Sequence, residues 1–455
     1  MASQRLLIFF EHGSGYLEIH GHIAITVYFL WVNFWSSIST FTSISITGLM
    51  NVPDGSRTQM PINKSFSVKS VESLHLAFKN SASYWETYRA NEGDRQTERF
   101  EFKQGWQTVY ARYIETPLVK VTFSDGTVGW GEANTGIGPD VVTLIVNSLM
   151  AQMIEGQEYE SPAALWDFLY DTQRGRGYSS GYWLDALAAI DIAVWDAIGK
   201  REQSPVAALL DPNPRKQFDV YLSGVRRSTL EERVEHVKSW IDTGLKGAKI
   251  FLTGDVEAGT TELDGLMAGA PELEQWMVDT LWMCSHESAE FGKIEYGKRN
   301  VRFFECPLQP EDLMGHQELV KKPGADIALG EHFRSRYQME QWVQQPRALD
   351  VYQPDIGRTG FTDYIVQMGI AAKAGIKTTP HMGSGVSVFQ AATLQCAAVA
   401  PPDYLQEFQG GLSDRLEKAS DTAWQYADGG FVLPDRPGIG VEINEALLEP
   451  FIVKH

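Results

Sequence analysis

Short apolar runs alternate with longer amphipathic stretches through the second half of the chain. Residues 275–278, 301–304 and 326–330 are such runs, bounded by Gly, Pro or charged residues, which is typical of buried parallel strands. The segments between the runs, such as 316–321 and 362–374, have a helix-like periodicity. Strands that alternate with helices favour βαβ units, so this half of the chain predicts a parallel sheet covered by helices.

A chemically active residue follows each predicted strand at nearly constant spacing. The six residues are Asp279, Glu305, Glu331, Asp355, His381 and Glu407. The successive intervals are 26, 26, 24, 26 and 26 residues, and one strand, one helix and two loops take roughly 25. In a (β/α)8 barrel the C-terminal ends of the strands converge on one face, where active sites are built. The spacing therefore predicts that these six side chains meet around one pocket.

The region from about residue 65 to 185 has a different pattern. Residues 118–123 alternate as a half-buried strand and residues 128–133 return after a turn, which predicts a β-hairpin. Residues 141–153 and 162–173 are predicted as helices. The region is therefore expected to form an α+β capping domain.

The two patterns together predict an α/β protein with a barrel catalytic domain over residues 186–430. A long helical stretch at 183–199 leads towards the first barrel strand, expected at 218–222. Residues 431–455 are expected to form a C-terminal segment that returns to the capping domain.

Residues 1–60 form a hydrophobic extension that does not fit the rest of the chain. Residues 23–35 are almost wholly apolar, which is shorter than the roughly 20 residues of a membrane span. Only Arg5 precedes this run, whereas a signal peptide has a basic leading region. Three interpretations stay open: a dispensable or wrongly assigned extension with Met60 as an alternative start, a membrane or targeting segment, and folded structure.

Composition limits the class of protein and of partner. The 455 residues contain 43% hydrophobic and 21% charged residues, which is ordinary for a large globular enzyme. The net charge of −19 argues against nucleic acid as a partner. Three cysteines, Cys284, Cys306 and Cys396, lack zinc-type or redox spacing. We therefore expect a reducing, cytoplasmic location, with a membrane or targeting role for the extension left open.

Several motifs, in their order and spacing, resemble one known family. They are residues 129–133 (GWGEA), 186–199 (ALAAIDIAVWDAIG), 304–307 (FECP), 330–331 (GE) and 353–360 (QPDIGRTG). Between about residues 65 and 450 the chain is similar to the mandelate racemase and muconate lactonizing enzyme family of the enolase superfamily, in particular to its acid-sugar dehydratase-like branch. The resemblance implies a modified TIM barrel, (β/α)7β, beneath the capping domain.

The resemblance also implies roles for the spaced residues. Asp279, Glu305 and Glu331 would hold Mg2+, which prefers hard oxygen ligands. His381 would be the general base, and Asp355 would fix its tautomer and raise its basicity. Family members of this kind remove the proton next to a substrate carboxylate and stabilise the resulting enediolate with the metal.

Four further residues are candidates for the same site. Lys249, at the end of the strand expected at 247–251, could neutralise the substrate carboxylate or assist proton transfer. Glu407 could hydrogen-bond the substrate or act as an acid. His332 and Arg358 are candidate substrate contacts, although His332 adjoins a ligand and neighbouring strand positions point to opposite faces.

Departures from the family pattern narrow the chemistry. The family often carries Lys-x-Lys at the second strand's end, whereas this chain has Lys249, Ile250 and Phe251. Because the second lysine is absent, two-base racemisation or epimerisation is disfavoured. Asn is often found two places after the first ligand, but this chain has Leu281 there. Residues 254–271 are expected to form an insert above the barrel mouth.

The expected function is Mg2+-dependent dehydration of an aldonic or related sugar acid to a 2-keto-3-deoxy acid. The enzyme would be a hydro-lyase, with a one-base isomerase (cycloisomerase, or epimerase or racemase) as the alternative. A catalytically lapsed paralogue that serves as a binding protein is the alternative from another class. The partner would be a small carboxylate, with specificity set by capping loops near 81–88 and 135–139, and the family resemblance suggests a homo-oligomer, a dimer or an octamer.

Overall fold

The computed structural model describes residues 64–79, 88, 90–383, 385–410, 416 and 419–454, with two short strands, β1 (Leu6–Phe9) and β2 (Tyr16–Ile19), near the start. The chain divides into two compact units, Met1–Gln59 and Met60–His455. The apolar run at 23–35 lies outside the described residues. In the described part of the chain, no helix has the length and apolar content needed to cross a bilayer.

Eight parallel strands form the barrel sheet. They are β10 (Gln217–Ser223), β11 (Gly247–Phe251), β12 (Gln275–Asp279), β13 (Phe303–Glu305), β14 (Asp326–Leu329), β15 (Val351–Tyr352), β16 (Lys377–Thr378) and β17 (Gln406–Phe408). Each strand from β10 to β15 pairs with the next along the chain, and β17 pairs with β10. The first two strands confirm the positions expected from the sequence.

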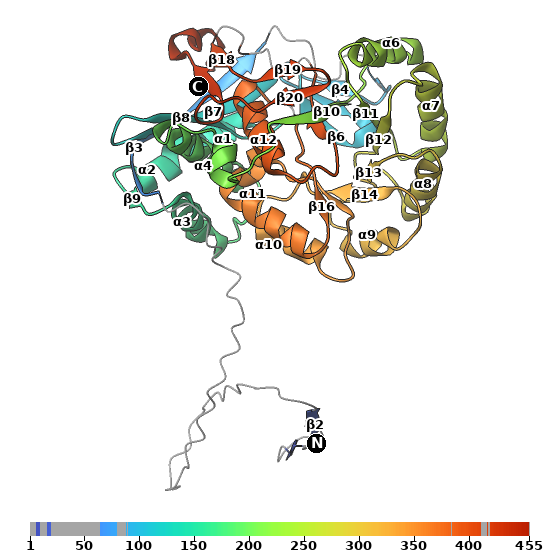
Figure 1. Ribbon diagram of the computed structural model, residues 1–455, viewed down its shortest axis with the longest axis horizontal. Coiled ribbons are helices and arrows are strands. Elements are labelled where there is room, and N and C mark those ends of the chain that lie inside the picture. The colour runs from blue at the N-terminus through green and yellow to red at the C-terminus, as the bar shows by residue number, and fades with distance from the viewer. Residues whose placement is uncertain are drawn as a thin grey trace. The chain divides into compact units, whose positions relative to one another are not determined.

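Seven helices connect these strands within the described residues. They are α6 (Leu230–Ile241), α7 (Val256–Gly269), α8 (His286–Lys298), α9 (Leu313–Val320), α10 (Arg336–Val343), α11 (Ile356–Lys373) and α12 (Ser387–Val399). Helices α6 to α9 follow one another along the outside of the sheet (Figure 1). The arrangement is the expected (β/α)7β form of the TIM barrel.

The expectation for residues 254–271 is wrong. This segment is not an insert above the barrel mouth but the barrel helix α7, which lies between α6 and α8. Its buried side chains include Val256, Leu263 and Leu266, which belong to the main hydrophobic core. The segment does not line the cavity described below.

An antiparallel sheet forms the centre of the N-terminal α+β region. Its order is β8 (Val128–Glu132), β7 (Ile114–Phe123), β3 (Phe66–Phe78) and β9 (Glu158–Tyr159), and β7 and β8 form the expected hairpin. Helices α1 (Pro139–Ile145), α2 (Ala151–Ile154) and α3 (Pro162–Arg174) follow, with a π-helical turn between α1 and α2. A second small sheet contains β4 (Arg95–Gln96), β5 (Phe100–Lys103) and β6 (Thr108–Ala111).

Helix α4 (Tyr182–Arg201) joins the two regions and is buried along nearly its whole length. It lies against β8 on one side and α11 on another, so that an apolar sequence on all faces is required. The approach to β8 is close because a Cβ atom at Gly131 would overlap the Ala189 carbonyl oxygen of α4. A short helix, α5 (Val206–Leu210), leads on to β10.

The chain ends against the N-terminal sheet. After β17 come β18 (Ser420–Thr422), β19 (Gln425–Ala427), β20 (Gly430–Val432) and β21 (Val441–Ile443). Ile452 then bridges Leu76 of β3, and the Val453 N–H donates to the His75 carbonyl. The domain boundaries given above stay predictions.

Candidate active site

The six spaced residues gather at the C-terminal edge of the barrel sheet. Asp279 and Glu305 are the last residues of β12 and β13, and Glu331 comes two residues after β14. Asp355 and His381 form a parallel bridge beyond β15 and β16. Glu407 lies in the middle of β17. The six side chains therefore surround one place, as their spacing predicts.

A cavity of about 180 Å³ opens at this place. Its barrel lining comprises Lys249, Phe251, Asp279, Leu281, Glu331, Arg358, His381, Gly383, Glu407 and Gln409. Glu305 is fully buried and does not line the cavity.

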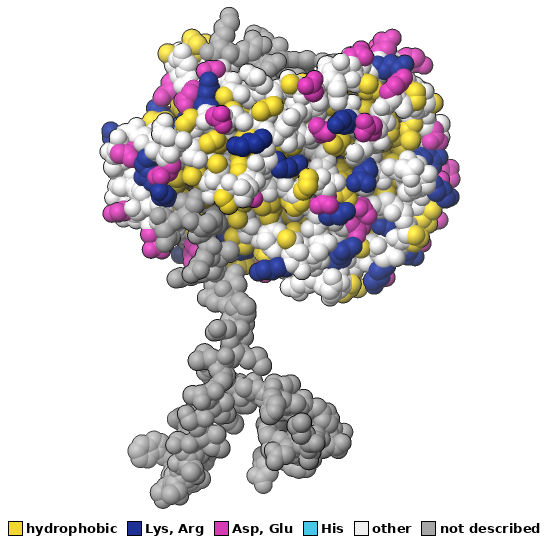
Figure 2. Space-filling model, in the orientation of Figure 1, with side chains coloured by type: hydrophobic (Ala, Val, Ile, Leu, Met, Phe, Trp, Pro, Cys, Tyr) yellow, Lys and Arg dark blue, Asp and Glu magenta, His cyan; other side chains and the backbone are white. Residues whose placement is uncertain are grey.

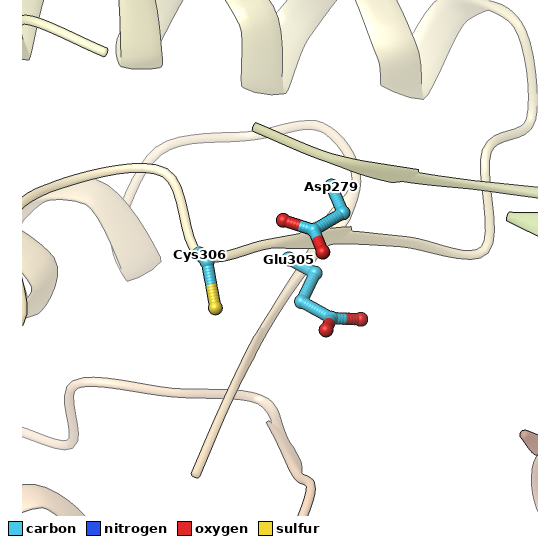
Figure 3. A group of neighbouring side chains, drawn as sticks. All are labelled: Asp279, Glu305 and Cys306. Atoms are coloured by element: carbon cyan, nitrogen blue, oxygen red, sulfur yellow. The ribbon is translucent and has the colours of Figure 1, made fainter. Parts of the chain in front are cut away.

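Two overlapping groups of side chains could hold a metal ion. One contains Asp279, Glu305 and Cys306, and the other contains Glu305, Glu331 and His381; in each group the ligand atoms lie within 4.8 Å of one another. Figure 3 shows the Asp279 and Glu305 carboxyl groups, which come from neighbouring strands, with the Cys306 thiol beside them. Because Glu305 belongs to both groups, the three predicted carboxylate ligands form one continuous set.

The acids in this set are crowded and buried, and they differ in how they are compensated. Burial raises the pKa of Glu331, but His381 and Arg358 outweigh it and lower that pKa below its usual value. Burial, followed by repulsion from Glu305, raises the pKa of Asp279 well above its usual value. Burial also raises the pKa of Glu305, although Lys249 opposes this shift. Such carboxyl groups take up positive charge readily, as a proton or as a cation.

Lys249 is the cation that these acids share. Its Nζ lies 2.8 Å from both Glu305 oxygens, 2.8 Å from Glu407 Oε1 and 3.9 Å from Asp279 Oδ2. Burial alone would lower the pKa of Lys249, but Glu305 and then Glu407 raise it well above its usual value. The amine is therefore charged and held in place.

His381 and Asp355 form the expected pair. His381 Nδ1 lies 2.7 Å from Asp355 Oδ2, and Nε2 lies 2.9 Å from Glu331 Oε2. Burial lowers the pKa of His381, but Glu407 and Glu331 outweigh this effect and raise it well above its usual value. The side-chain amide of Asn134 donates to the same Asp355 oxygen at 2.6 Å. No local feature of the sequence marks Asn134, and sequence reasoning missed it.

The structure brings one of the two candidate substrate contacts to the cavity. Arg358 lines it and donates from its guanidinium to the Glu331 carbonyl. His332 instead lies outside the cavity, with its ring centroid 4.8 Å from that of Trp282 and 5.9 Å from that of Trp342. Burial lowers the pKa of His332 to about 3, so that its ring is neutral. Glu331 and His332 lie in the turn after β14, and only Glu331 lines the cavity.

The N-terminal region supplies the rest of the lining, comprising Tyr110, Ala111, Tyr113, Ile114, Glu115, Asn134 and Gly136. The expected specificity loop at 135–139 thus contributes Gly136. Of the expected loop at 81–88 only Tyr88 is described, and its hydroxyl donates to the Phe251 carbonyl of β11. The β6–β7 segment, which contributes most of these residues, was not expected at the site.

Comparison with known proteins decides the family. Residues 102–211 match the N-terminal domain of mandelate racemase and muconate lactonizing enzyme, and residues 232–447 match the enolase C-terminal domain-like family. The chain belongs to the mandelate racemase and muconate lactonizing enzyme family. A solved member of the enolase superfamily from Agrobacterium tumefaciens superposes with a TM-score of 0.78 at 30% identity, over 85% of this chain and 99% of that one.

Two characterised relatives in this family differ in reaction. D-galactarolactone cycloisomerase from Agrobacterium fabrum is 28% identical over 352 residues, 73% of this chain and 90% of its own. Arabinonate dehydratase from Saccharolobus solfataricus is 25% identical over 351 residues, 75% of this chain and 91% of its own. These relatives agree with the expectation of a lyase first and an isomerase second.

Enolase superfamily members generally use Mg2+, and the residues present here fit that ion. Asp279, Glu305 and Glu331 offer carboxylate oxygens, the ligand type that Mg2+ prefers. Cys306 is a soft ligand that Mg2+ does not favour, and burial raises the pKa of its thiol well above the usual value. The donor set is therefore three acids rather than a thiolate site.

Proposed function

We propose that this protein is a Mg2+-dependent dehydratase of a sugar acid, which yields a 2-keto-3-deoxy acid. The observation that carries the proposal is the position of the His381–Asp355 pair beside three convergent carboxylates. Phe251 stands where a second lysine base would be expected, so that the cavity has one histidine base and no equivalent base on β11. One base that first accepts and then donates a proton suits elimination of water.

Asp279, Glu305 and Glu331 would hold the metal ion. When bound, Mg2+ supplies a Lewis acid that draws negative charge from the substrate carboxylate. Lys249 and Arg358 bring further positive charge to the same end of the cavity, where they orient that carboxylate.

His381 moves the protons in this proposal. Asp355 accepts the Nδ1 hydrogen, whereas Glu331, 2.9 Å from Nε2, favours a hydrogen on that nitrogen as well. As a ligand of the metal ion, Glu331 would no longer stabilise that charged form, which would leave the Nε2 lone pair to accept the proton from the α-carbon. The electron pair of the α-carbon–hydrogen bond forms a double bond to the β-carbon, and the bond from the β-carbon to its hydroxyl oxygen breaks. His381 returns the proton to that oxygen, water leaves, and the enol tautomerises to the 2-keto acid. Glu407, 4.0 Å from His381 Nε2, can hydrogen-bond a substrate hydroxyl.

A one-base isomerase is the second candidate, because the cycloisomerase from Agrobacterium fabrum is similar over most of its length. The same first proton transfer serves both reactions. In dehydration the bond between the β-carbon and a hydroxyl oxygen breaks afterwards, whereas in cycloisomerisation a carbon–oxygen bond of a ring breaks.

A substrate screen tests the proposal. The full-length protein with Mg2+ is offered aldonic, deoxyaldonic and aldaric acids, and 2-keto product is measured with a carbonyl reagent. We expect a product with at least one acid, and its loss in His381→Asn. The same panel is incubated in deuterium oxide. Deuterium at the α-carbon without a keto product would support isomerisation, and no exchange with any acid would refute both candidates.

A further inference from the structure

We infer that Asn134 is a positioning residue, contributed by the N-terminal region, that holds Asp355 in the rotamer needed to orient His381. The inference rests on the proposed function, since it concerns the residue behind the proposed base. The loop after β8 would then contribute to catalysis and not only to substrate selection.

One oxygen of Asp355 receives both hydrogen bonds. The Asn134 amide donates to Oδ2 at 2.6 Å, and His381 Nδ1 lies 2.7 Å from the same atom. Asp355 Oδ1 is buried and has no hydrogen-bond partner within the described residues. Within the described residues, the hydrogen bonds that fix the Asp355 carboxylate therefore come from Asn134 and His381.

Asp355 has a competing conformation close at hand. It is the N-cap residue of α11, with extended backbone angles of φ −100° and ψ 117°, yet its side chain makes no capping hydrogen bond. An Asp at this position ordinarily accepts a hydrogen bond from the first turn of the helix, which stabilises the helix by about 1 kcal/mol. Asn134 holds the carboxylate away from that alternative, and its loss would let Asp355 turn towards α11.

Asn134 is itself fixed on both sides. Its backbone N–H donates to the Gly357 carbonyl at 3.1 Å. A Cβ atom at Gly357 would clash with the Asn134 backbone nitrogen, and a Cβ atom at Gly383 would overlap its side-chain amide. Glycine at both positions lets the loop after β8 reach the His381–Asp355 pair, and Asn134 is 4% exposed.

A double-mutant cycle separates positioning from a general structural effect. Asn134→Ala is made alone and together with Asp355→Asn, and α-proton exchange, kcat and KM are measured. Because Asn134 acts through Asp355, we expect kcat to fall about 10- to 100-fold in the single variant with KM nearly unchanged. In the Asp355→Asn background the same substitution should cost less than about twofold.

Tyr113→Phe is the matched control. Tyr113 also lines the cavity from the N-terminal region, but its hydroxyl donates to the Glu98 carbonyl and not to Asp355. Tyr113→Phe should change kcat by the same factor in the wild type and in Asp355→Asn. Equal losses from Asn134→Ala in both backgrounds would overturn the inference.

A spectroscopic measurement keeps the inference testable without turnover. In nitrogen-15 spectra of histidine-labelled protein, the His381 signals are identified as those lost in His381→Asn. The spectra are recorded at a pH above the pKa of His381, where one ring nitrogen carries the hydrogen. We expect this hydrogen on Nδ1 in the wild type, and a mixture of tautomers in Asn134→Ala at unchanged thermal stability. The same tautomer in both proteins would overturn the positioning role. A silent substrate screen with the expected tautomer change would refute only the proposed function.

Discussion

At the scale of single residues, the Lys249 amine lies beside carboxylates that are also proposed to bind a divalent cation. Its amine neutralises Glu305 and Glu407 in a fully buried setting. Removal of one partner from a buried ion pair typically destabilises a protein by about 3–5 kcal/mol. A cation bound to the neighbouring carboxylates would replace part of the lost charge and stabilise the folded state by mass action.

We therefore expect Lys249→Met to lower the midpoint of thermal unfolding by several degrees in EDTA. Mg2+ should raise that midpoint at least about twice as far in the variant as in the wild type. The control is Lys246→Met, since Lys246 forms a partly exposed pair with Asp219 that is worth about 1 kcal/mol or less. Equal Mg2+ effects on Lys249→Met and wild type would show that the lysine and the ion do not share these acids.

Asp191 gives a second prediction at this scale. It is a buried residue of α4 whose carboxyl oxygens accept hydrogen bonds from the Thr362 N–H and hydroxyl. Burial raises the pKa of Asp191 from 3.8 to about 7. An acid whose pKa is higher in the folded state contributes stability that is complete below about pH 4 and is lost as the pH rises through about 7.

Asp191→Asn removes this titration and keeps one acceptor oxygen. Relative to wild type, the free energy of unfolding of the variant should rise between pH 5 and pH 8. The rise ends as the pH passes about 7, so the limit over this interval is about 3 kcal/mol, at roughly 1.4 kcal/mol for each pH unit. Urea unfolding of both proteins at the two pH values measures the difference in their free energies of unfolding. A difference that does not change with pH would contradict the raised pKa of Asp191.

At the scale of elements, the contact between β8 and α4 sets how the N-terminal region meets the barrel. Because a Cβ atom at Gly131 would overlap the Ala189 carbonyl oxygen, Gly131→Ala should force the strand from the helix. We expect a loss of about 1–3 kcal/mol or more in the free energy of unfolding, the usual effect of overpacking. Gly175→Ala is the matched control, since its Cβ would meet no atom within 4 Å, and an equal loss there would contradict the explanation.

Six of the barrel strands, β12 to β17, were predictable from sequence because one of the six spaced residues lies in or shortly after each of them. Helix α7 was not, because only Val256, Leu263 and a few other side chains face the core, and its many Gly, Glu and Thr residues resemble a loop. The lining residues of the β6–β7 segment were not predicted for a related reason. The alternation of side chains along a strand indicates which of them are buried, but not which of them line a cavity.

Within the site, sequence reasoning could find residues that share the βα interval but not those that reach it from elsewhere. Asp355 and His381 are one unit apart, so that register alone places them together. Asn134 lies 221 residues from Asp355 and meets it only through the packing of β8 on α4 and of α4 on α11. Conversely, closeness in sequence does not guarantee a place at the site, because His332 adjoins Glu331 but its ring lies outside the cavity.

At the scale of the whole molecule, the cations that line the cavity are placed asymmetrically. Lys249, Arg358 and His381 come from the barrel, as do the acids Asp279, Glu331 and Glu407, whereas the charged residue that the N-terminal region contributes is Glu115. Burial raises the pKa of Glu115, but His75 and Arg99 outweigh it and lower the pKa below its usual value, so that the carboxylate is charged. Figure 2 shows acidic and basic side chains mixed over the outer face in that view, so the asymmetry is a property of the cavity.

This asymmetry predicts selection for a single carboxylate. We expect kcat/KM for the best aldonic acid to exceed that for the aldaric acid of the same stereochemistry at least about 10-fold, because a second carboxylate would meet Glu115. Glu115→Gln should narrow the ratio, whereas Asp140→Asn, which also loses a partner of Arg99 but does not line the cavity, should leave it unchanged. An aldaric acid preferred by the wild type would contradict this account while leaving dehydration intact.

The pairing of β17 with β10 has a consequence for the order of assembly in time. The first and last barrel strands meet in the register Tyr221 to Glu407, so that Glu407 joins Lys249 only when the sheet closes on itself. During synthesis, Asn134 and the three acids proposed to bind the metal ion leave the ribosome before this last strand does. Helices and most of the sheet can therefore form early, but the site becomes complete only with the final closing step.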